Sequence, residues 1–245
     1  MQPVAPYGRL AARYDAALGN DNFRRTRRAF EHLVRRHGIR FRTAVDLGCG
    51  TGMFARYLAR CWRALVFAVD RSPAMLRVAR CRARGEPVRL LLQDLRSLQL
   101  PCPVDLATAN FDTVNHITSA RDLRSVFDSV ARHLRPGGHF VFDVVTPCRP
   151  LGGFRRLARV MRCAAARIVQ RIQWNPLQRS IRVQVLVSTP AGSSVEEHRE
   201  RAWDPSEVAR WLDEAGFVIR GVYDAATLKS AVFCPPRAVI VAQRR

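Results

Sequence analysis

Residues 44–52 read Ala-Val-Asp-Leu-Gly-Cys-Gly-Thr-Gly, an apolar segment with an acid near its end and then glycine at every second position. The pattern predicts a buried β-strand over 44–47 that ends in a tight turn. Glycine has no Cβ atom and tolerates positive φ, so a ligand can lie directly against the backbone of Gly48, Gly50 and Gly52. Asp46 places a carboxylate near this turn, where a cationic ligand group is stabilised. The stretch therefore predicts an α/β fold with a ligand site at the end of this strand.

Two further acids follow the next two apolar runs of the chain. Asp70 ends the run 64–70, 24 positions after Asp46, and Asp94 follows the run 88–92. The first interval is about one step of strand, helix and strand, after which an acid reaches the hydroxyl pair of a ribose. Asp94 is suited to an adenine amino group. An acid for a cation, an acid for a sugar and a glycine turn between them predict S-adenosylmethionine as the cofactor.

A dinucleotide is the nearest alternative ligand. The segment Gly50-Thr-Gly-Met-Phe-Ala55 satisfies the relaxed G-x-G-x-x-A pattern, so glycine spacing alone does not exclude NAD. Asp46 argues against NAD, because an acid two residues before the glycines has little use beside an anionic pyrophosphate. Asp94 argues in the same direction. A purely structural glycine turn with capping acids is the remaining alternative.

The strongly basic composition needs an explanation of its own. The 245 residues suit one α/β domain with a small insertion, and the formal net charge of +21 suggests nucleic-acid binding at first sight. However, Lys229 is the only lysine, and the arginines are spread along the whole chain. Such a bias fits GC-rich codon usage better than selection for phosphate binding, which normally uses both residues. Nucleic acid is therefore a disfavoured partner.

Cysteine usage and hydropathy give expectations about metals and location. The seven cysteines include no Cys-x-x-Cys pair, so we predict neither a disulfide framework nor a metal site. The N-terminal residues lack the long apolar region of a signal peptide, and no apolar run approaches the ~20 residues that span a bilayer. We expect a cytoplasmic protein without membrane partners.

Helices and strands are expected to alternate through the first 147 residues, which is typical of a parallel sheet covered on both faces. Expected helices lie over 8–17, 22–37, 53–61 and 120–133, with another that begins at Ser72-Pro73. Expected strands lie over 44–47, 65–69, 88–92, 104–109 and 139–145, the last after a Pro-Gly-Gly stop at 136–138.

The pattern changes after Pro147. Residues 153–166 look like a connecting helix with a solvated row of arginines, and strand-like segments follow at 168–174, 180–188 and 195–203. We interpret them as an inserted antiparallel sheet. A helix over 205–215, capped by Asp204, and two strands over 217–223 and 238–243 end the chain. Without a helix between them, these two strands predict a terminal hairpin with an antiparallel last strand.

The predicted fold is therefore α/β: a Rossmann-like, doubly wound, seven-stranded sheet with an antiparallel last strand, plus an inserted antiparallel β cap. We expect a single domain. Its parts are an N-terminal helical lid over 1–40, a core over 41–147 and 204–245, and the cap over 148–203.

In this order the segments resemble the class I S-adenosylmethionine-dependent methyltransferases across nearly the whole chain. Among them, the chain is similar to small-molecule N- and O-methyltransferases that carry a β-stranded cap over the acceptor site. The motifs that carry the resemblance are Tyr7 to Tyr14-Asp15, Val45-Asp-Leu-Gly-Cys-Gly-Thr-Gly52, Val69-Asp-Arg-Ser-Pro-Ala-Met-Leu76, Gln93-Asp-Leu95, Phe111-Asp-Thr-Val-Asn-His116 and Leu134-Arg-Pro-Gly-Gly138.

The resemblance implies cofactor contacts that divide into two groups. For the methionine end, it places Gly48, Gly50, Thr51 and Gly52 against the ligand, Asp46 near the ammonium group, and Asn110 and Phe111 beside the sulfonium. For the nucleoside end, it places Asp70 on the ribose hydroxyls, Met75 against the adenine ring, and Asp94 with the backbone of Leu95 at the adenine amino group. Tyr14 resembles a lid tyrosine over the methionine carboxylate, and an ordinary packing role is equally compatible with the sequence.

Methyl transfer requires the acceptor to be aligned with the S–CH₃ bond and shielded from water. A hydroxyl acceptor also needs a base, and an amine must be unprotonated. His116 and Asp112 follow the strand over 104–109 and are the candidate catalytic residues, although a histidine in the first turn of a helix is more often a satisfied polar residue. Asp112 is a candidate base or an anchor for a cationic acceptor. Glu196, Glu197, His198 and Glu200 are candidates for the acceptor pocket, with alternation placing at most half of them inward.

Two other function classes remain open at this point. A nucleic-acid methyltransferase would use the arginines, but amino-methylating enzymes of that class carry a Pro-Pro-aromatic motif where this chain has Asn110-Phe-Asp-Thr113. A cytosine-C5 enzyme needs a Pro-Cys motif at the same place, and the Pro-Cys pairs of this chain lie elsewhere, at 101–102 and 147–148. The other class is a non-catalytic scaffold that binds the cofactor.

Overall fold

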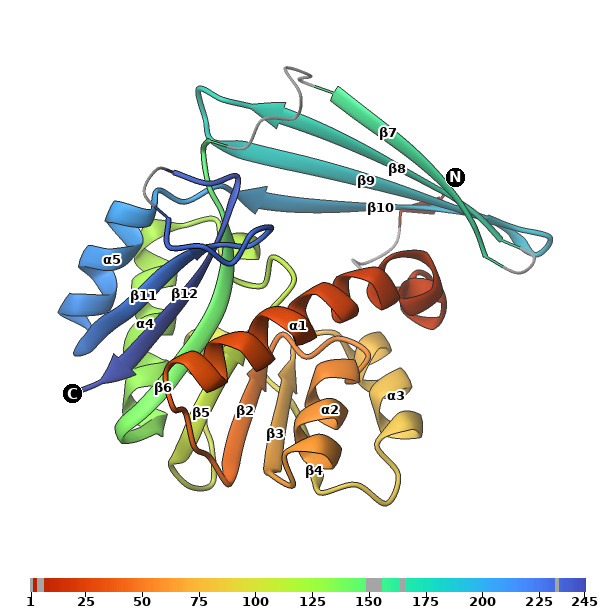
Figure 1. The fold of residues 1–245 in the computed structure, drawn as a ribbon. Helices are drawn as coiled ribbons and strands as arrows, with labels where there is room; N and C mark the ends of the chain where they lie inside the picture. Colours follow the sequence, from red (N-terminus) through yellow and green to blue (C-terminus); the bar gives the residue numbers. More distant parts are fainter. Residues whose placement is uncertain (1, 4–6, 149–155, 164–165, 232–233) are drawn as a thin grey trace.

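Two separate β-sheets frame the protein (Figure 1). The computed structural model describes residues 2–3, 7–148, 156–163, 166–231 and 234–245. One sheet has seven strands and is flanked by helices, and the other has five strands and lies beyond the carboxyl ends of the parallel strands. Within the described ranges, no helix combines the length and the apolar character needed to cross a membrane.

The seven-stranded sheet has the order β11-β12-β6-β5-β2-β3-β4. Its strands are β2 (Thr43–Leu47), β3 (Leu65–Asp70), β4 (Val88–Leu92), β5 (Val104–Ala109), β6 (Leu134–Val145), β11 (Phe217–Asp224) and β12 (Arg237–Arg244). The pairs from β6 to β4 are parallel, whereas β12 is antiparallel to both β6 and β11. The predicted seven-stranded sheet with an antiparallel last strand is confirmed.

Helices cover both faces of this sheet, as expected from its apolar strands. They are α1 (Asn20–Arg36), α2 (Met53–Cys61), α3 (Pro73–Arg82), α4 (Ala120–His133) and α5 (Pro205–Glu214). Two apolar clusters lie between the helices and the sheet. One packs α4 and α5 against it, and the other packs α1, α2 and Leu76 of α3 against it. Three of these helices begin with a capping side chain, since Ser72, Ser119 and Asp204 accept hydrogen bonds from backbone N–H groups of the first turn.

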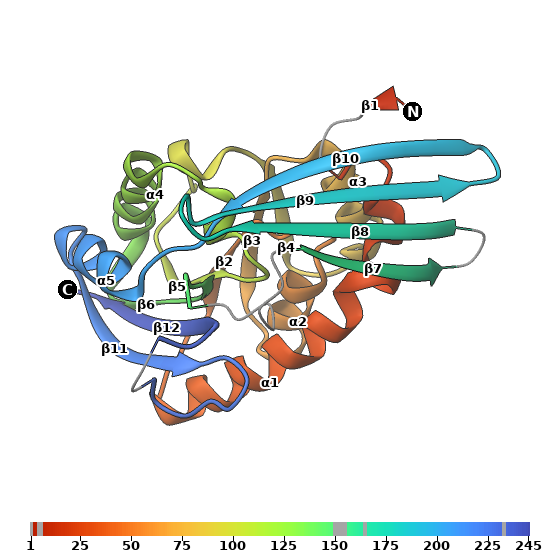
Figure 2. The same ribbon diagram turned by 90° about the horizontal axis from the view of Figure 1, so that it is seen from above.

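The five-stranded sheet has the order β1-β10-β9-β8-β7 (Figure 2). Its strands are β1 (Gln2–Pro3), β7 (Arg156–Cys163), β8 (Ala166–Asn175), β9 (Ser180–Thr189) and β10 (Gly192–Arg201). The strands β7 to β10 are antiparallel, and we call them the cap sheet. The predicted antiparallel insertion is confirmed, with one strand more than the three expected.

The additional strand, β7, corrects the predicted connecting helix over 153–166. Residues 153–155 and 164–165 of that prediction lie outside the described residues, and Arg156–Cys163 form a strand paired along its length with β8. Arginine, leucine, alanine and methionine all favour helices, so local propensity predicted a helix. Pairing with β8 outweighs this preference, because strand formation depends on cross-strand neighbours more than on intrinsic tendency.

Two other boundaries differ from the sequence prediction. The expected helix over 8–17 is a short 3₁₀ turn at Ala11–Arg13 followed by a π-helical turn at Asp15–Gly19. Strand β6 begins at Leu134 rather than at residue 139, with a break in its pairing to β5. Gly137, with φ of +78°, lies in this irregular stretch, so the Pro-Gly-Gly segment bends the strand rather than preceding it.

Candidate active site

The three glycines of the turn after β2 serve two purposes. All three have positive φ: +65° at Gly48, +55° at Gly50 and +76° at Gly52. A Cβ atom at Gly48 would lie 2.5 Å from Oγ1 of Thr113, and one at Gly52 would lie 3.0 Å from Cβ of Ala79 in α3. A Cβ atom at Gly50 would meet nothing within 4 Å. Gly48 and Gly52 therefore permit close packing, whereas Gly50 faces open space.

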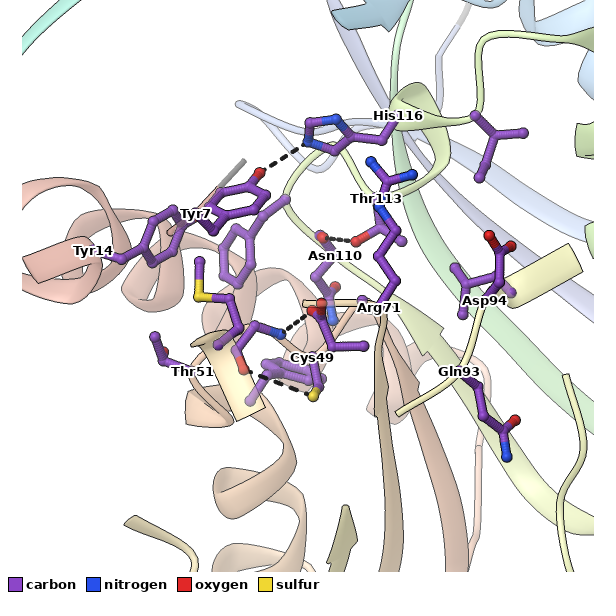
Figure 3. A pocket seen from close by; sticks show the side chains of 18 of the residues that line it. Tyr7, Tyr14, Cys49, Thr51, Arg71, Gln93, Asp94, Asn110, Thr113 and His116 are labelled. Atoms are coloured by element: carbon purple, nitrogen blue, oxygen red, sulfur yellow. Dashed lines mark hydrogen bonds between the residues drawn. The ribbon is translucent and has the colours of Figure 1, made fainter. Parts of the chain in front are cut away.

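That space is a cavity of about 230 Å³ at the carboxyl ends of the parallel strands. Of the predicted cofactor residues, all but Asp46 and Gly52 line it: Tyr14, Gly48, Gly50, Thr51, Asp70, Met75, Asp94, Leu95, Asn110 and Phe111. Gln93 and Asp94 lie toward one end of the cavity, and Tyr7 and Tyr14 lie toward the other (Figure 3). We call this space the first cavity.

Asp70 ties the glycine turn to the end of β3. Its two carboxylate oxygens accept hydrogen bonds of 2.8 Å from the backbone N–H groups of Gly50 and Ser72. Burial raises the pKa of Asp70 above its usual value, although these hydrogen bonds act in the opposite direction. A carboxylate has room for about four hydrogen bonds, so Asp70 retains acceptor capacity toward the first cavity.

Asp94 is held by an arginine that the sequence analysis did not single out. The guanidinium of Arg96 donates to both carboxylate oxygens of Asp94, at 2.9 and 2.7 Å. The pKa of Asp94 is lowered, and the largest cause is the hydrogen bonding from the Arg96 side chain. Arg71 and Arg96 both line the first cavity. Their positions immediately after Asp70 and two residues after Asp94 are the only sequence signal that marks them.

Asp46 lies beneath the glycine turn instead of in the cavity wall. Its side chain is 2% exposed and accepts a hydrogen bond of 2.8 Å from Oγ1 of Thr108. Burial raises the pKa of Asp46 to about 7, against the effect of hydrogen bonds from Thr108, Asn110 and the backbone of Ala55. The carboxylate therefore connects β2, β5 and the start of α2, and the structure brings it into no contact with the cavity surface.

The segment that follows β5 is held in an unusual conformation. Phe111 and Asp112 are consecutive non-glycine residues with φ of +59° and +65°, a state that costs about 1–3 kcal/mol per residue. The guanidinium of Arg237, at the start of β12, lies 2.6 Å from the Asp112 carboxylate and also pairs with Asp143 of β6. This charged cluster stabilises the strained segment, which forms a wall of the first cavity at Phe111.

A second cavity of about 150 Å³ lies under the cap sheet. It shares Tyr7, Tyr14, Phe111 and His116 with the first cavity. Its other polar lining residues include Asp112 from the segment after β5, Arg237 from β12, and Arg159, Gln170, His198 and Glu200 from the cap sheet. The two cavities therefore meet at a wall of three aromatic rings and one imidazole.

His116 lies where the cavities meet. Its Nε2 is 3.1 Å from the hydroxyl of Tyr7 and 4.0 Å from a carboxylate oxygen of Glu200. Burial lowers the pKa of His116 to about 4, so the ring is neutral at neutral pH. Burial also raises the pKa of Tyr7 well above its usual value, so the phenol keeps its proton at neutral pH. Both predicted catalytic residues, His116 and Asp112, thus border the second cavity.

The segment 7–19, which we call the N-terminal segment, is fastened by a buried glutamate of β10. The backbone N–H groups of Tyr7, Arg9 and Leu10 donate to the carboxylate of Glu196, at 2.7, 2.9 and 3.0 Å. Burial alone would raise the pKa of Glu196, but the nearby His198, at 3.6 Å, and the hydrogen bonds from these N–H groups hold it below its usual value. Glu196 is thus an anchor and not a pocket residue, a role that no local pattern indicates.

Side-chain alternation along β10 determines which of its other candidate pocket residues face inward. Glu196, His198 and Glu200 are buried on one face, whereas Glu197 points outward and pairs with Arg199 at 3.0 Å. Three of the four residues therefore face inward, and the expectation of at most half was wrong because three of them share the same parity. Only His198 and Glu200 of this group line the second cavity.

Comparison with known proteins supports this geometry. Residues 44–138 match the family model described as a methyltransferase domain. A dTDP-3-amino-3,6-dideoxy-alpha-D-glucopyranose N,N-dimethyltransferase of Streptomyces fradiae is 31% identical over 145 residues, 58% of this chain and 55% of that relative. A trans-aconitate 2-methyltransferase of Azoarcus sp. (strain BH72) is 38% identical over 115 residues, 46% of this chain and 43% of that relative. The chain thus spans about half the length of these curated relatives.

Solved structures match over almost the whole chain. An S-adenosylmethionine-dependent methyltransferase from Clostridium acetobutylicum ATCC 824 has a TM-score of 0.81 at 24% identity, covering 97% of this chain and 98% of that one. The amino pentose methyltransferase CalS10 from Micromonospora echinaspora, solved with S-adenosylmethionine bound, has a TM-score of 0.69 at 23% identity, covering 91% of both chains. The protein therefore shares the fold of these S-adenosylmethionine-dependent methyltransferases, and its residues 44–138 match the methyltransferase-domain model.

Proposed function

We propose that the protein transfers the methyl group of S-adenosylmethionine to an amino group of a small molecule bound in the second cavity. The observation that carries the proposal is the wall shared by the two cavities, formed by Tyr7, Tyr14, Phe111 and His116. A cofactor in the first cavity and an acceptor in the second would meet there. Holding the two reactants in line can lower the barrier by roughly 7–11 kcal/mol without a covalent intermediate.

The first cavity has the donors and acceptors that S-adenosylmethionine requires. The open space over Gly50 accommodates a ligand against the backbone. Asn110 lines the first cavity, and its buried side chain lies beside the Asp46 carboxylate, whose pKa it helps to lower. When bound, the cofactor supplies an electrophilic methyl group on a positively charged sulfur.

We assign the cofactor contacts as follows. Asp70 accepts from the ribose hydroxyls, Asp94 from the adenine amino group, and Met75 packs against the adenine ring. The turn residues Gly48, Gly50 and Thr51 approach the methionine end, and Tyr14 covers it. Asp46 and Gly52 act behind this surface, since both support the turn without lining the first cavity.

Charge at the inner end of the second cavity favours an amine over a hydroxyl acceptor. Asp112 and Asp143 both pair with the single guanidinium of Arg237, and Glu200 lies near a neutral imidazole. The Asp112 and Glu200 carboxylates line this cavity, and a protonated amine is stabilised beside them on binding. The amine must then lose its proton before it can attack.

His116 is the group best placed to accept that proton. At neutral pH its ring carries no positive charge, and its Nε2 shares a hydrogen bond with the Tyr7 hydroxyl at the shared wall. Glu200 and Asp112 would stabilise the imidazolium once it forms. Its low pKa limits His116 as a base, so alignment by the cavity walls would contribute more than proton transfer.

The names of the relatives agree with a small-molecule acceptor. They refer to amino sugars and trans-aconitate, and one curated relative is named a cypemycin N-terminal methyltransferase. An RNA or DNA acceptor has no feature of the described site in its favour. A cytoplasmic location is part of the proposal, consistent with seven cysteines that are all free in the structure.

The proposal is tested by calorimetry with S-adenosylhomocysteine, followed by a screen of amine and hydroxyl acceptors with labelled S-adenosylmethionine. We expect micromolar cofactor binding and label transfer to amines. Binding without transfer to any class of acceptor would instead support a scaffold. Label transfer to RNA or DNA, but not to small amines, would support the nucleic-acid alternative.

A further inference from the structure

Strand β7 places one arginine on the inner face of the cap sheet. In its register with β8, Arg159 pairs with Gln170 across the strands, and both side chains line the second cavity. Arg162, three residues later, belongs to the opposite face by alternation and does not line the cavity. The inward position of Arg159 is therefore a property of this residue and not of the arginine-rich composition.

Arg159 differs from the other arginine of the second cavity in having no counter-charge. Arg237 is paired with Asp112 and Asp143. In the part of the chain that the structure describes, by contrast, no carboxylate lies within ion-pair distance of Arg159. A guanidinium without a partner is free to bind an oxyanion through its planar set of N–H donors.

Two carboxamides extend this set of donors. Gln170 of β8 and Asn22 of α1 line the same cavity, and neither side chain has a hydrogen-bond partner among the described residues. Strand β7 also contacts the π-helical turn Asp15–Gly19, which directly precedes α1. The outer end of the second cavity thus collects one positive charge and two amide groups from three different elements.

The two ends of the second cavity therefore differ in charge. Glu200 lies on β10, three strands from β7 and four residues along from Glu196, which is level with Arg159, so the backbones of Glu200 and Arg159 are roughly 20 Å apart at ordinary strand spacing. The Asp112 and Glu200 carboxylates lie toward the inner end, and the Arg159 guanidinium lies at the outer end. An acceptor that complements both ends carries an amine at one end and a negative group at the other.

We propose that Arg159, with Gln170 and Asn22, binds an oxyanionic group of the acceptor, either a phosphate or a carboxylate. This inference rests on the proposed function, because it assigns the outer end of the acceptor cavity. It names Arg159 as a residue that selects acceptors by charge, while His116 and Glu200 face the reacting end.

The test is isothermal titration calorimetry of the full chain, saturated with S-adenosylhomocysteine, against pyrophosphate and, separately, against tricarballylate. The variants are Arg159→Gln, Arg159→Lys, and Arg162→Gln as a matched control on the outer face of the same strand. For the anion that the wild type binds, we expect Arg159→Gln to raise Kd at least tenfold. Arg159→Lys should recover part of the loss, and Arg162→Gln should stay within twofold of the wild type.

The two anions distinguish the chemistry, and the controls distinguish a site from general surface charge. Tight binding of pyrophosphate alone identifies a phosphate-bearing acceptor, and tight binding of tricarballylate alone identifies a carboxylate-bearing one. Equal losses in Arg159→Gln and Arg162→Gln, or no binding of either anion by the wild type at about 10 mM, would overturn the inference. Methyl transfer to amines is measured separately, so the proposed function can survive that result.

Discussion

Gly50 illustrates how a single missing Cβ atom can serve a ligand instead of the fold. A Cβ atom there would project into the first cavity, where it would meet no protein atom within 4 Å. We predict that Gly50→Val abolishes binding of S-adenosylhomocysteine in calorimetry, because the branched side chain fills the ligand's place. Gly85→Val is the matched control: Gly85 also has positive φ and open space around it, but it does not line the cavity. Equal binding by both variants would contradict this role of the turn.

Asp70 is predicted to be the main polar contact of the cofactor. Hydrogen bonds to charged groups contribute about 1.5–3 kcal/mol, so Asp70→Ala should weaken S-adenosylhomocysteine binding at least tenfold. The control is Asp105→Ala. Asp105 likewise accepts backbone hydrogen bonds, from Arg42 and Thr43, but at the other end of the sheet. That variant should lower the melting temperature and leave the cofactor Kd within twofold. An unchanged Kd in folded Asp70→Ala would remove Asp70 from the binding site.

The buried ring of His116 makes the folding stability of the protein depend on pH in mild acid. Its pKa of about 4 in the folded protein lies below the ordinary 6.5, so between these pH values the unfolded chain binds more protons at this position. The stabilisation is complete above pH 6.5 and is lost as the pH falls from 6.5 to 4, by up to about 3 kcal/mol. We predict that urea unfolding of His116→Gln shows a smaller loss of free energy between pH 7 and pH 4.5 than the wild type. Parallel losses would show that the ring is not buried as described.

At the scale of elements, Glu196 joins strand β10 to the N-terminal segment. We predict that Glu196→Gln weakens cofactor binding severalfold and speeds proteolysis near residues 7–14. The reason is that a neutral amide is a weaker acceptor for three backbone N–H groups than a carboxylate. Glu197→Gln is the control, because this neighbour points outward and pairs with the exposed Arg182 and Arg199. Similar proteolysis of the two variants would contradict the anchoring role.

The elements that could be predicted from sequence are those whose signals are local. Helix α4 matches its expected bounds because a single apolar face and a serine cap mark it. Strand β7 was missed because its residue types favour a helix and only pairing with β8 makes it a strand. In the same way, the first cavity was largely predicted from residues at strand ends. The role of Arg237 was not predicted, because its partner Asp112 lies far away in the sequence and no local pattern connects the two residues.

At the scale of the whole molecule, Asn115 joins the two sheets. Its side-chain nitrogen donates to the carbonyls of Val145, at the end of β6, and of Arg201, at the end of β10, while its oxygen accepts from the N–H of Val145. Each buried group left unpaired costs about 1–3 kcal/mol, so Asn115→Leu should lose at least about 3 kcal/mol in urea unfolding. Asn175→Leu, at the exposed end of β8, should lose less than about 1 kcal/mol. Comparable losses would contradict the role of Asn115 as the joint.

The anchoring of the N-terminal segment by the cap sheet has a consequence for the timing of turnover. Tyr7 and Tyr14 belong to this segment and form walls of both cavities. Neither cavity can be emptied through that wall without the same movement. We therefore expect both products to leave after one common opening event, so that a single slow step, sensitive to solvent viscosity, governs the release of both.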